Sequence, residues 1–413
     1  MKVMKKIFLI AALAIVVTAA YAQKKNVSIA DKATWEEVPN FTEARQAIQA
    51  AMVEPTTANQ AKTWAVAGLV EMRFVEMEAN KQAYGQPADE AGMYAALGDS
   101  YKYFLKAVEL EKIPNEKGKV STKYTKQIRE KLKNNLVHFY YGGGYYNNND
   151  NKEAAYTMFN TVDELCHQDF MAEAEINCQD SLHMQCRLLA AVVALQIGNY
   201  QQALVALEKS KADDFNGLDV YNYIAYAYGQ LKDFDNQAKT FKEGLQKYGA
   251  AANGEDYAFM PRLINLYISQ NKSADAISLI EEALVENPND YEFWKVLGSL
   301  YYDEKNEVKA IEALKKSIEV NPEYADAYGE LGRIYYNKAI TISNETNEIQ
   351  NNEEYKKARE EKVKPAFMEA APYFEKALEL KPYETNYMYN LKNIYYNAED
   401  GANLERIEKL MGE

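Results

Sequence analysis

Cysteine and histidine are the residue types in this chain best suited to covalent or metal chemistry, and five of them lie close together in the sequence. They are Cys166, His167, Cys178, His183 and Cys186. Thiolate and imidazole groups together bind zinc, but the spacing matches no familiar zinc motif and contains no C-x-x-C pair. In an oxidising compartment, a disulfide from Cys166 to Cys178 or to Cys186 is the favoured interpretation. Unreactive core thiols and a metal site are the alternatives.

Catalytic motifs are not found elsewhere in the sequence. The histidines His138, His167 and His183 form no H-E-x-x-H pattern, and no G-x-S-x-G elbow occurs. The segment YYGGGYY, residues 140–146, lacks the Lys-Ser/Thr of a phosphate-binding loop. Because glycine within a helix costs about 1 kcal/mol relative to alanine, we expect its glycines to serve close helix packing or a kink, with ligand approach as the less favoured alternative. No enzyme activity, no cofactor and no metal are expected.

The first 22 residues have the three parts of a secretory signal peptide. Lysines at positions 2, 5 and 6 form a basic segment, residues 7–17 an apolar one, and the Ala-Tyr-Ala at 20–22 a cleavage site. A lipoprotein would need a cysteine directly after the signal, but the first cysteine is Cys166. We therefore expect an exported mature chain that is not inserted in a membrane, with the periplasm as the favoured location and the extracellular space as the alternative.

The mature chain is strongly acidic. Without the three lysines of the signal, the chain has 44 lysine and arginine residues and 61 aspartate and glutamate residues. Such a charge disfavours binding to phosphate backbones and to anionic lipid. Nucleic acid is therefore not an expected partner.

A regular grid of large and small side chains between residues 294 and 322 predicts a pair of helices. Residues at i, i+3, i+4 and i+7 share one helix face, and here they are Trp294, Leu297, Gly298 and Tyr301. In the second helix the matching face carries Ala310, Leu314 and Ser317, and Pro322 ends it. Small side chains at 298 and 310 let the two backbones approach closely, and we expect Trp294 to be buried between them.

The grid recurs every 34 residues, as from Pro288 to Pro322 and from Met260 to Trp294. A period of 34 with W-x2-L-G-x2-Y, then A-x3 and an apolar residue, then proline, resembles the tetratricopeptide repeat (TPR) family. The resemblance implies an all-α fold, a superhelical solenoid of antiparallel helix pairs.

The resemblance covers about residues 40 to 411 and is strongest after residue 180. We therefore divide the mature chain into degenerate TPR-like helical repeats in residues 23–179 and a TPR array in residues 180–413. One copy in the array opens at Gly332, but its second half, with Phe374, arrives about 26 residues late. The offset predicts an inserted helical extension at about residues 338–364.

A concave groove lined by the first helix of each pair is a further implication of the resemblance, and in the family it holds an extended peptide or a partner helix. Side chains turned away from the packed face are the predicted groove residues. Asparagine amides can pair with peptide N–H and C=O groups, and tyrosine offers an amphipathic plate. Where two tyrosines are consecutive, as at 301–302, 335–336 and 395–396, we predict that the first lies in the core and the second in the groove. The predicted groove residues are Asn222, Tyr226, Asn265, Lys295, Ser299, Tyr302, Arg333, Tyr336, Asn337, Tyr389, Asn393 and Tyr396.

The predicted function is that of an exported, non-catalytic scaffold that binds a protein or an extended peptide in this groove. Exported bacterial proteins of this family are implied, by resemblance alone, to serve cell-envelope assembly or secretion. The alternative is a periplasmic ligand-binding protein whose tyrosines and asparagines hold a glycan or a peptide.

Overall fold

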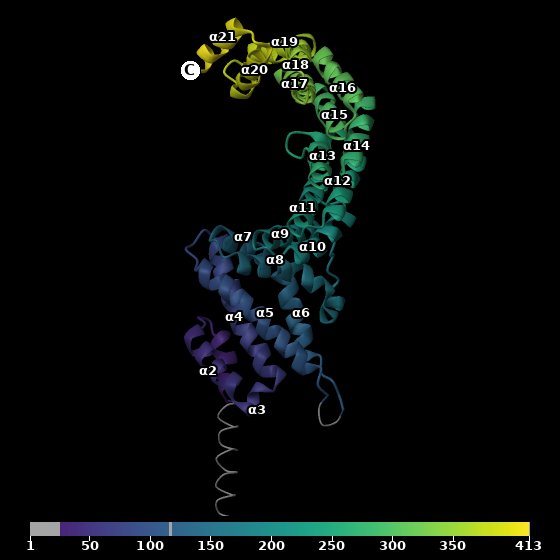
Figure 1. Cartoon of the computed structure of the whole chain (residues 1–413). Helices are drawn as coiled ribbons and strands as arrows, with labels where there is room; N and C mark the ends of the chain where they lie inside the picture. Colours follow the sequence, from purple (N-terminus) through teal and green to yellow (C-terminus); the bar gives the residue numbers. More distant parts are fainter. Residues whose placement is uncertain (1–24, 115–117, 413) are drawn as a thin grey trace, which may run out of the picture. The chain divides into compact units, whose positions relative to one another are not determined.

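Every regular element in the described part of the chain is a helix. The computed structural model describes residues 25–114 and 118–412, and the predicted signal peptide lies outside them. The described residues fall into two compact units, unit 1 up to Gly244 and unit 2 from Leu245 onward (Figure 1). No helix of the described residues is both long and apolar enough to cross a membrane. The predicted all-α fold of paired helices is confirmed.

Unit 1 begins with a helical segment at residues 25–34. Its further helices pack mostly against their neighbours in sequence. They are α2 (Phe41–Val53), α3 (Pro55–Ala58), α4 (Ala61–Ala83), α5 (Glu90–Glu111), α6 (Lys123–Asn134), α7 (Leu136–Asn148), α8 (Lys152–His167), η1 (Asp169–Ala174), α9 (Ser181–Gln196), α10 (Tyr200–Ala212), α11 (Gly217–Gln230) and α12 (Phe234–Tyr248), whose last turn lies beyond the boundary.

Unit 2 continues the succession of helices with one unusually long member. Its elements are η2 (Gly249–Asn253), α13 (Phe259–Ser269), α14 (Ser273–Glu286), α15 (Tyr291–Asp303), α16 (Glu307–Val320), α17 (Ala325–Asn347), α18 (Asn352–Ala358), the π-helical η3 (Arg359–Val363), α19 (Lys364–Leu380), α20 (Thr385–Ala398) and α21 (Gly401–Met411). Neighbouring helices such as α15 and α16 pack closely along their length.

One kind of turn joins five successive helix pairs, from α7–α8 to α15–α16, and also the pair α20–α21. A residue with positive φ follows the first helix, and the next backbone N–H donates to the carbonyl five residues earlier. Between α15 and α16, Lys305 has φ 63° and the N–H of Asn306 donates to the carbonyl of Tyr301 at 2.8 Å. The corresponding donors are Asn151, Asn199, Asp233, Lys272 and Asp400, at 2.8–2.9 Å. The last part of unit 1 therefore has the same helix-pair construction as unit 2.

Glycine in the first helix of a pair lets the second helix approach. A Cβ at Gly298 would lie 2.7 Å from the Leu314 side chain, and a Cβ at Gly332 would lie 2.9 Å from the Phe374 ring. Leu314 follows its glycine by 16 residues and Phe374 follows its glycine by 42, which is 26 more. The two contacts are therefore equivalent, and the extra residues lie between Gly332 and Phe374.

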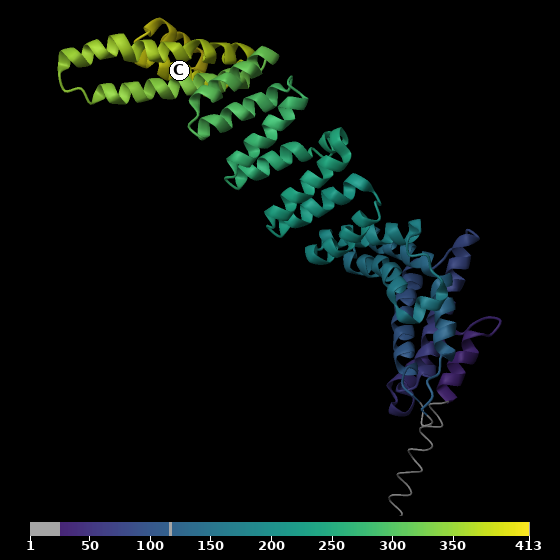
Figure 2. The same ribbon diagram turned by 90° about the vertical axis from the view of Figure 1, so that its right-hand side faces the viewer.

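The extra residues form a long helical hairpin. Helix α17 runs to Asn347, the chain turns at residues 348–351, and α18, η3 and α19 return alongside it (Figure 2). Asn351 caps α18 by accepting hydrogen bonds from the backbone N–H groups of Glu353 and Glu354. Ala339, from the outgoing helix, joins the same apolar core as Val363 and Phe367 from the returning segment. The hairpin is thus packed against itself by its own side chains.

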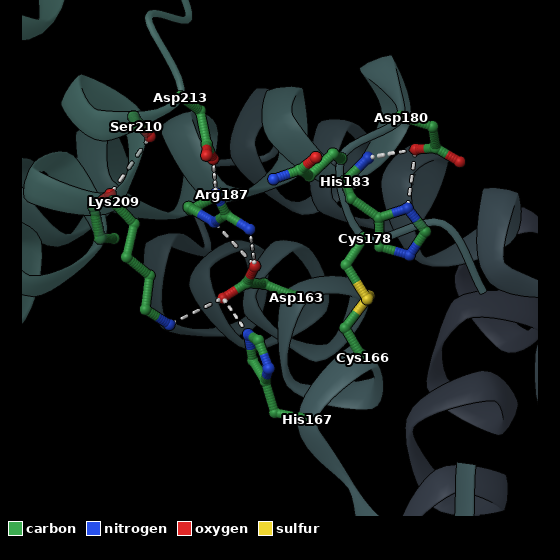
Figure 3. A network of polar contacts seen from close by, with 12 residues as sticks. Asp163, Cys166, His167, Cys178, Asp180, His183, Arg187, Lys209, Ser210 and Asp213 are labelled. Atoms are coloured by element: carbon green, nitrogen blue, oxygen red, sulfur yellow. Dashed lines mark hydrogen bonds and ion pairs between the residues drawn. A yellow bond between two sulfur atoms is a disulfide. The ribbon is translucent and has the colours of Figure 1, made fainter. Parts of the chain in front are cut away.

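A disulfide in unit 1 joins Cys166, at the end of α8, to Cys178, just before α9 (Figure 3). Their Cα atoms are 5.7 Å apart. Cys186 is free and buried. Burial raises the pKa of its thiol to about 12, with the charges of Asp180 and Asp163 adding to the effect, so the thiol stays protonated and unreactive. No group of three metal-ligating side chains exists among the described residues.

Loss of this disulfide is expected to destabilise unit 1. The bond closes a 12-residue separation, for which loop-closure entropy predicts a loss of about 2–3 kcal/mol in the free energy of unfolding. We therefore expect urea denaturation of the Cys166→Ser/Cys178→Ser variant to show that loss. Adding a reductant should bring the native chain to the same value and leave the variant unchanged. Equal stability of the oxidised and reduced native chain would contradict the prediction.

Candidate functional site

A cleft in unit 2 lies where three successive first helices, α15, α17 and α20, come together above α19. Its volume is about 490 Å³. Most of its lining side chains are polar or charged, and its floor includes the buried ring of Phe374. The lining side chains belong to Lys295, Asp326, Glu330, Arg333, Tyr336, Asn337, Phe374, Asn386, Tyr387 and Asn390, with Gly329 completing the wall.

Asp326 of α17 links this helix to α20 through hydrogen bonds. Its Oδ1 accepts hydrogen bonds from Lys381 Nζ at 2.6 Å and from the Tyr387 hydroxyl at 3.1 Å. Burial alone would raise the pKa of Asp326, but the hydrogen bond and charge of Lys381, with smaller contributions from Tyr387 and Lys295, outweigh it and lower that pKa. Gly329 allows the approach, since a Cβ there would lie 2.6 Å from the Tyr387 ring. This wall of the cleft is therefore rigid and carries an ionised carboxylate.

Arg333 and Asn337 link α17 to Tyr302 of α15. The guanidinium lies 5.0 Å from the centre of the Tyr302 ring, and Asn337 Nδ2 donates to the Tyr302 hydroxyl at 3.0 Å. Arg333 also donates twice to Glu330 Oε2, at 2.8 and 2.6 Å. Its cationic plane is thereby held in a fixed orientation at the cleft.

Three asparagine amides are held so that their oxygens are available. Asn337 donates to Tyr302, Asn386 Nδ2 donates to a Glu384 carboxylate oxygen at 3.1 Å, and Asn390 Nδ2 donates to the Asn386 carbonyl at 2.7 Å. No donor among the described residues is bonded to the side-chain oxygens of these three residues. The cleft therefore offers acceptors for N–H groups of an extended chain.

The structure brings together five of the predicted groove residues. Lys295, Arg333, Tyr336 and Asn337 line the cleft, and Tyr302 contacts two of them. Ser299 is half-buried beside them on α15, where its hydroxyl donates to the Lys295 carbonyl at 3.3 Å.

The remaining predicted groove residues lie elsewhere. Asn222 and Tyr226 belong to unit 1, where the Tyr226 ring meets Tyr200 edge to face at 6.3 Å. Asn265 is exposed on α13. Outside the cleft, α20 carries the exposed side chains of Tyr389, Asn393 and Tyr396.

Doubled tyrosines follow the predicted division only in part. Tyr301 and Tyr395, first members of their pairs, are buried as predicted, but Tyr335 is half-buried and stacks on Tyr373 at 5.1 Å. Tyr336, expected to stand free in the groove, packs edge to face against the buried ring of Phe367 at 5.7 Å. Burial also raises the pKa of Tyr336. Tyr336 therefore lines the cleft and also packs against the core of unit 2.

A second hollow in unit 2 lies between α14 and α16 and is mainly apolar. Its volume is about 670 Å³, and Leu284, Val285 and Trp294 contribute to its lining. The sequence predicts a buried Trp294, but its indole is half-exposed in this crevice and donates to the Pro288 carbonyl at 2.8 Å. The prediction fails because α14 and α16 leave the face of α15 between them open.

The segment from Arg262 to Glu319, which covers most of α13 and all of α14 and α15, matches the family model of the tetratricopeptide repeat. The match ends just before the end of α16. Residues 262–319 are therefore similar to tetratricopeptide repeats, and arrays of such repeats typically bind other proteins on extended surfaces. No curated protein matches the sequence.

Similar solved structures are TPR proteins of low sequence identity. The C-terminal part of a TPR repeat-containing protein from Cytophaga hutchinsonii is 16% identical, with 66% of this chain and 93% of that chain covered and a TM-score of 0.41. A TPR repeats protein from Bacteroides fragilis is 18% identical, with coverages of 64% and 98% and a TM-score of 0.31. YrrB, described as a TPR protein with an unusual peptide-binding site, is 13% identical, with coverages of 50% and 97% and a TM-score of 0.32.

Proposed function

We propose that the protein is an exported, non-catalytic interaction protein that binds an extended segment of a partner protein in the unit 2 cleft. The observation that carries the proposal is the set of fixed amide oxygens on α17 and α20, because an extended peptide presents backbone N–H groups that need acceptors. The similarity of residues 262–319 to tetratricopeptide repeats supports the same class of function. Export rests on the signal-peptide pattern of residues 1–22, and a role in envelope assembly or secretion rests only on the resemblance to exported proteins of the family.

Charge in the cleft favours a partner segment with an acidic group. Asp326 is matched by Lys381, and Arg333 is paired with Glu330 on the same helix. Lys295, in contrast, forms no ion pair within the described residues and leaves a positive charge at the α15 side. A carboxylate on the bound peptide can therefore pair with Lys295.

Removing two amide oxygens of the cleft should weaken partner binding without unfolding the protein. Partners are captured from envelope extract by residues 23–413 and identified, and the dissociation constant of the bound peptide is measured by fluorescence anisotropy. We expect Asn386→Ala/Asn390→Ala to raise that constant about tenfold, because two hydrogen bonds of about 0.5–1.5 kcal/mol each are lost. Helicity and melting temperature should stay unchanged.

The same helix supplies a matched control. Asn397 Nδ2 donates to the Asn393 carbonyl at 2.8 Å, as Asn390 does to Asn386 at 2.7 Å, but neither Asn393 nor Asn397 lines the cleft. The Asn393→Ala/Asn397→Ala variant should therefore bind like the native chain. Equal weakening by both pairs, or by neither, would contradict a binding site in this cleft.

A further inference from the structure

A separate cleft in unit 1 is lined by tyrosine side chains from α5 and α7 and by asparagine side chains at the C-terminal end of α7. Its volume is about 780 Å³. Tyr94 comes from α5, Tyr140, Tyr141 and Tyr145 come from α7, and the asparagines at 147–149 close one end. Neither the tetratricopeptide match nor the unit 2 cleft includes any of these residues.

The glycine run of α7 leaves one position at this cleft open. A Cβ at Gly142 would lie 2.9 Å from the Tyr94 ring, and one at Gly143 would lie 2.5 Å from the Phe159 ring, so helix packing explains both residues. A Cβ at Gly144 would meet no atom within 4 Å, and Gly144 lines the cleft. Because glycine disfavours a helix interior, an open position that keeps glycine fits a site where a ligand approaches the backbone.

Four tyrosine rings line the cleft, together with the apolar side chains of Phe159 and Leu189. Tyr94 and Tyr145 lie 5.1 Å apart, and Tyr140 meets Tyr141 edge to face at 5.5 Å. Tyr141 is 55% exposed, whereas Tyr94 is held by packing at the bottom of the cleft. Such an arrangement provides rigid flat plates, each with a polar hydroxyl at its rim.

The asparagines at the end of α7 present a donor beside an acceptor. Asn147 Oδ1 accepts from Lys152 Nζ at 3.0 Å, which leaves its amide N–H groups as donors. Asn149 Nδ2 donates to the Tyr145 carbonyl at 2.8 Å, which leaves its oxygen as an acceptor. A sugar hydroxyl both donates and accepts, so this pairing matches it.

The charged groups that line the unit 1 cleft restrict the class of ligand that it can bind. Glu90 lines the cleft and accepts from Gln82 at 2.8 Å, and no lysine or arginine lines it. Glu90 would repel an anionic ligand, and Lys152, which contacts the lining residue Asn147, is paired with Asp150 at 3.8 Å. A proline-rich peptide, which has few N–H donors, would leave the Asn149 and Glu90 acceptors without partners. We propose that this cleft binds a neutral oligosaccharide, with pyranose faces on the tyrosine rings and hydroxyls on the asparagines and Glu90.

Isothermal titration calorimetry of residues 23–413 with maltohexaose, cellohexaose, mannohexaose and chitohexaose tests the proposal. We expect at least one of these to bind the native chain. Gly144→Ala should raise the melting temperature, because alanine favours the helix, and yet raise the dissociation constant at least threefold, because the methyl group enters the cleft. A merely structural glycine would not give these opposite changes.

A second pair of variants supplies the matched control. Tyr141→Ala should raise the dissociation constant at least tenfold, whereas Tyr226→Ala, which removes a tyrosine of unit 1 that is 44% exposed and outside the cleft, should leave it unchanged. The proposal is overturned if none of the four sugars binds, if Gly144→Ala binds as the native chain does, or if a proline-rich peptide binds here instead. The asparagine variants of unit 2 should leave sugar binding intact, so this result is independent of the proposed peptide site.

Discussion

Replacing Arg187 with alanine is expected to lower the free energy of unfolding of unit 1 by about 3–5 kcal/mol, because it leaves a buried carboxylate without its partner. Arg187, on α9, is 6% exposed and donates to Asp163 Oδ1 of α8 at 2.7 Å. It also pairs with Asp213, which follows α10 (Figure 3). The other basic side chains near Asp163 are Lys209 at 3.5 Å and His167 at 4.0 Å, both farther from the carboxylate than the guanidinium.

The effect should be local to the helices that the network joins. Urea denaturation measures the loss, and hydrogen exchange should be faster at the amides of α8 and α9. Lys209→Ala is the control, and we expect it to cost less than about 1 kcal/mol because the lysine is partly exposed. A loss below about 1 kcal/mol for Arg187→Ala would mean that water solvates Asp163.

The fold could be predicted from the sequence because its packing rule is short-range. Small residues such as Gly298 and Ala310 mark where two helices touch, and each large partner follows at a fixed distance along the chain. Even the contact between Gly332 and Phe374 follows once 26 inserted residues are allowed for. The spacing of apolar residues does not reveal the π-helical turn at Arg359–Val363. That turn depends on how the returning helical segment of the hairpin packs against α17.

The candidate cleft could be predicted only in part, because a groove depends on which neighbour each helix face meets. On α17, the rotation of the helix places Arg333 and Asn337 correctly. On α20, the cleft uses Asn386, Tyr387 and Asn390 rather than Tyr389, which lies two residues, about 200° of helix rotation, beyond Tyr387. Tyr387 faces α17 and Tyr389 does not, but the sequence of α20 alone does not distinguish the two sides.

Helix patterns also do not reveal surfaces that remain open. Trp294 has the spacing of a core residue but borders an apolar crevice. The three glycines of α7 look alike in sequence, yet two meet aromatic rings and Gly144 meets nothing. Both outcomes depend on whether another element covers the position, which is a property of the assembled helices rather than of a local segment.

Replacing Phe374 with alanine is the second change expected to have a large effect, a loss of about 3–5 kcal/mol in the free energy of unfolding of unit 2. The ring is 2% exposed and fills the space between α17 and α19, directly over Gly332. It also forms part of the floor of the unit 2 cleft. The loss should appear in urea denaturation and as faster hydrogen exchange at the amides of α17 and α19.

A double-mutant cycle with Gly332 tests the contact itself. In the native chain, Gly332→Ala should destabilise unit 2 because its Cβ would lie 2.9 Å from the Phe374 ring. In the Phe374→Ala background that clash is absent, so the same substitution should be neutral or stabilising by up to about 1 kcal/mol, the helix preference of alanine over glycine. The sign of the effect at Gly332 should therefore reverse between the two backgrounds. An equal effect in both would show that the glycine is not there to admit the ring, and the alignment of the inserted repeat would then have no packing basis.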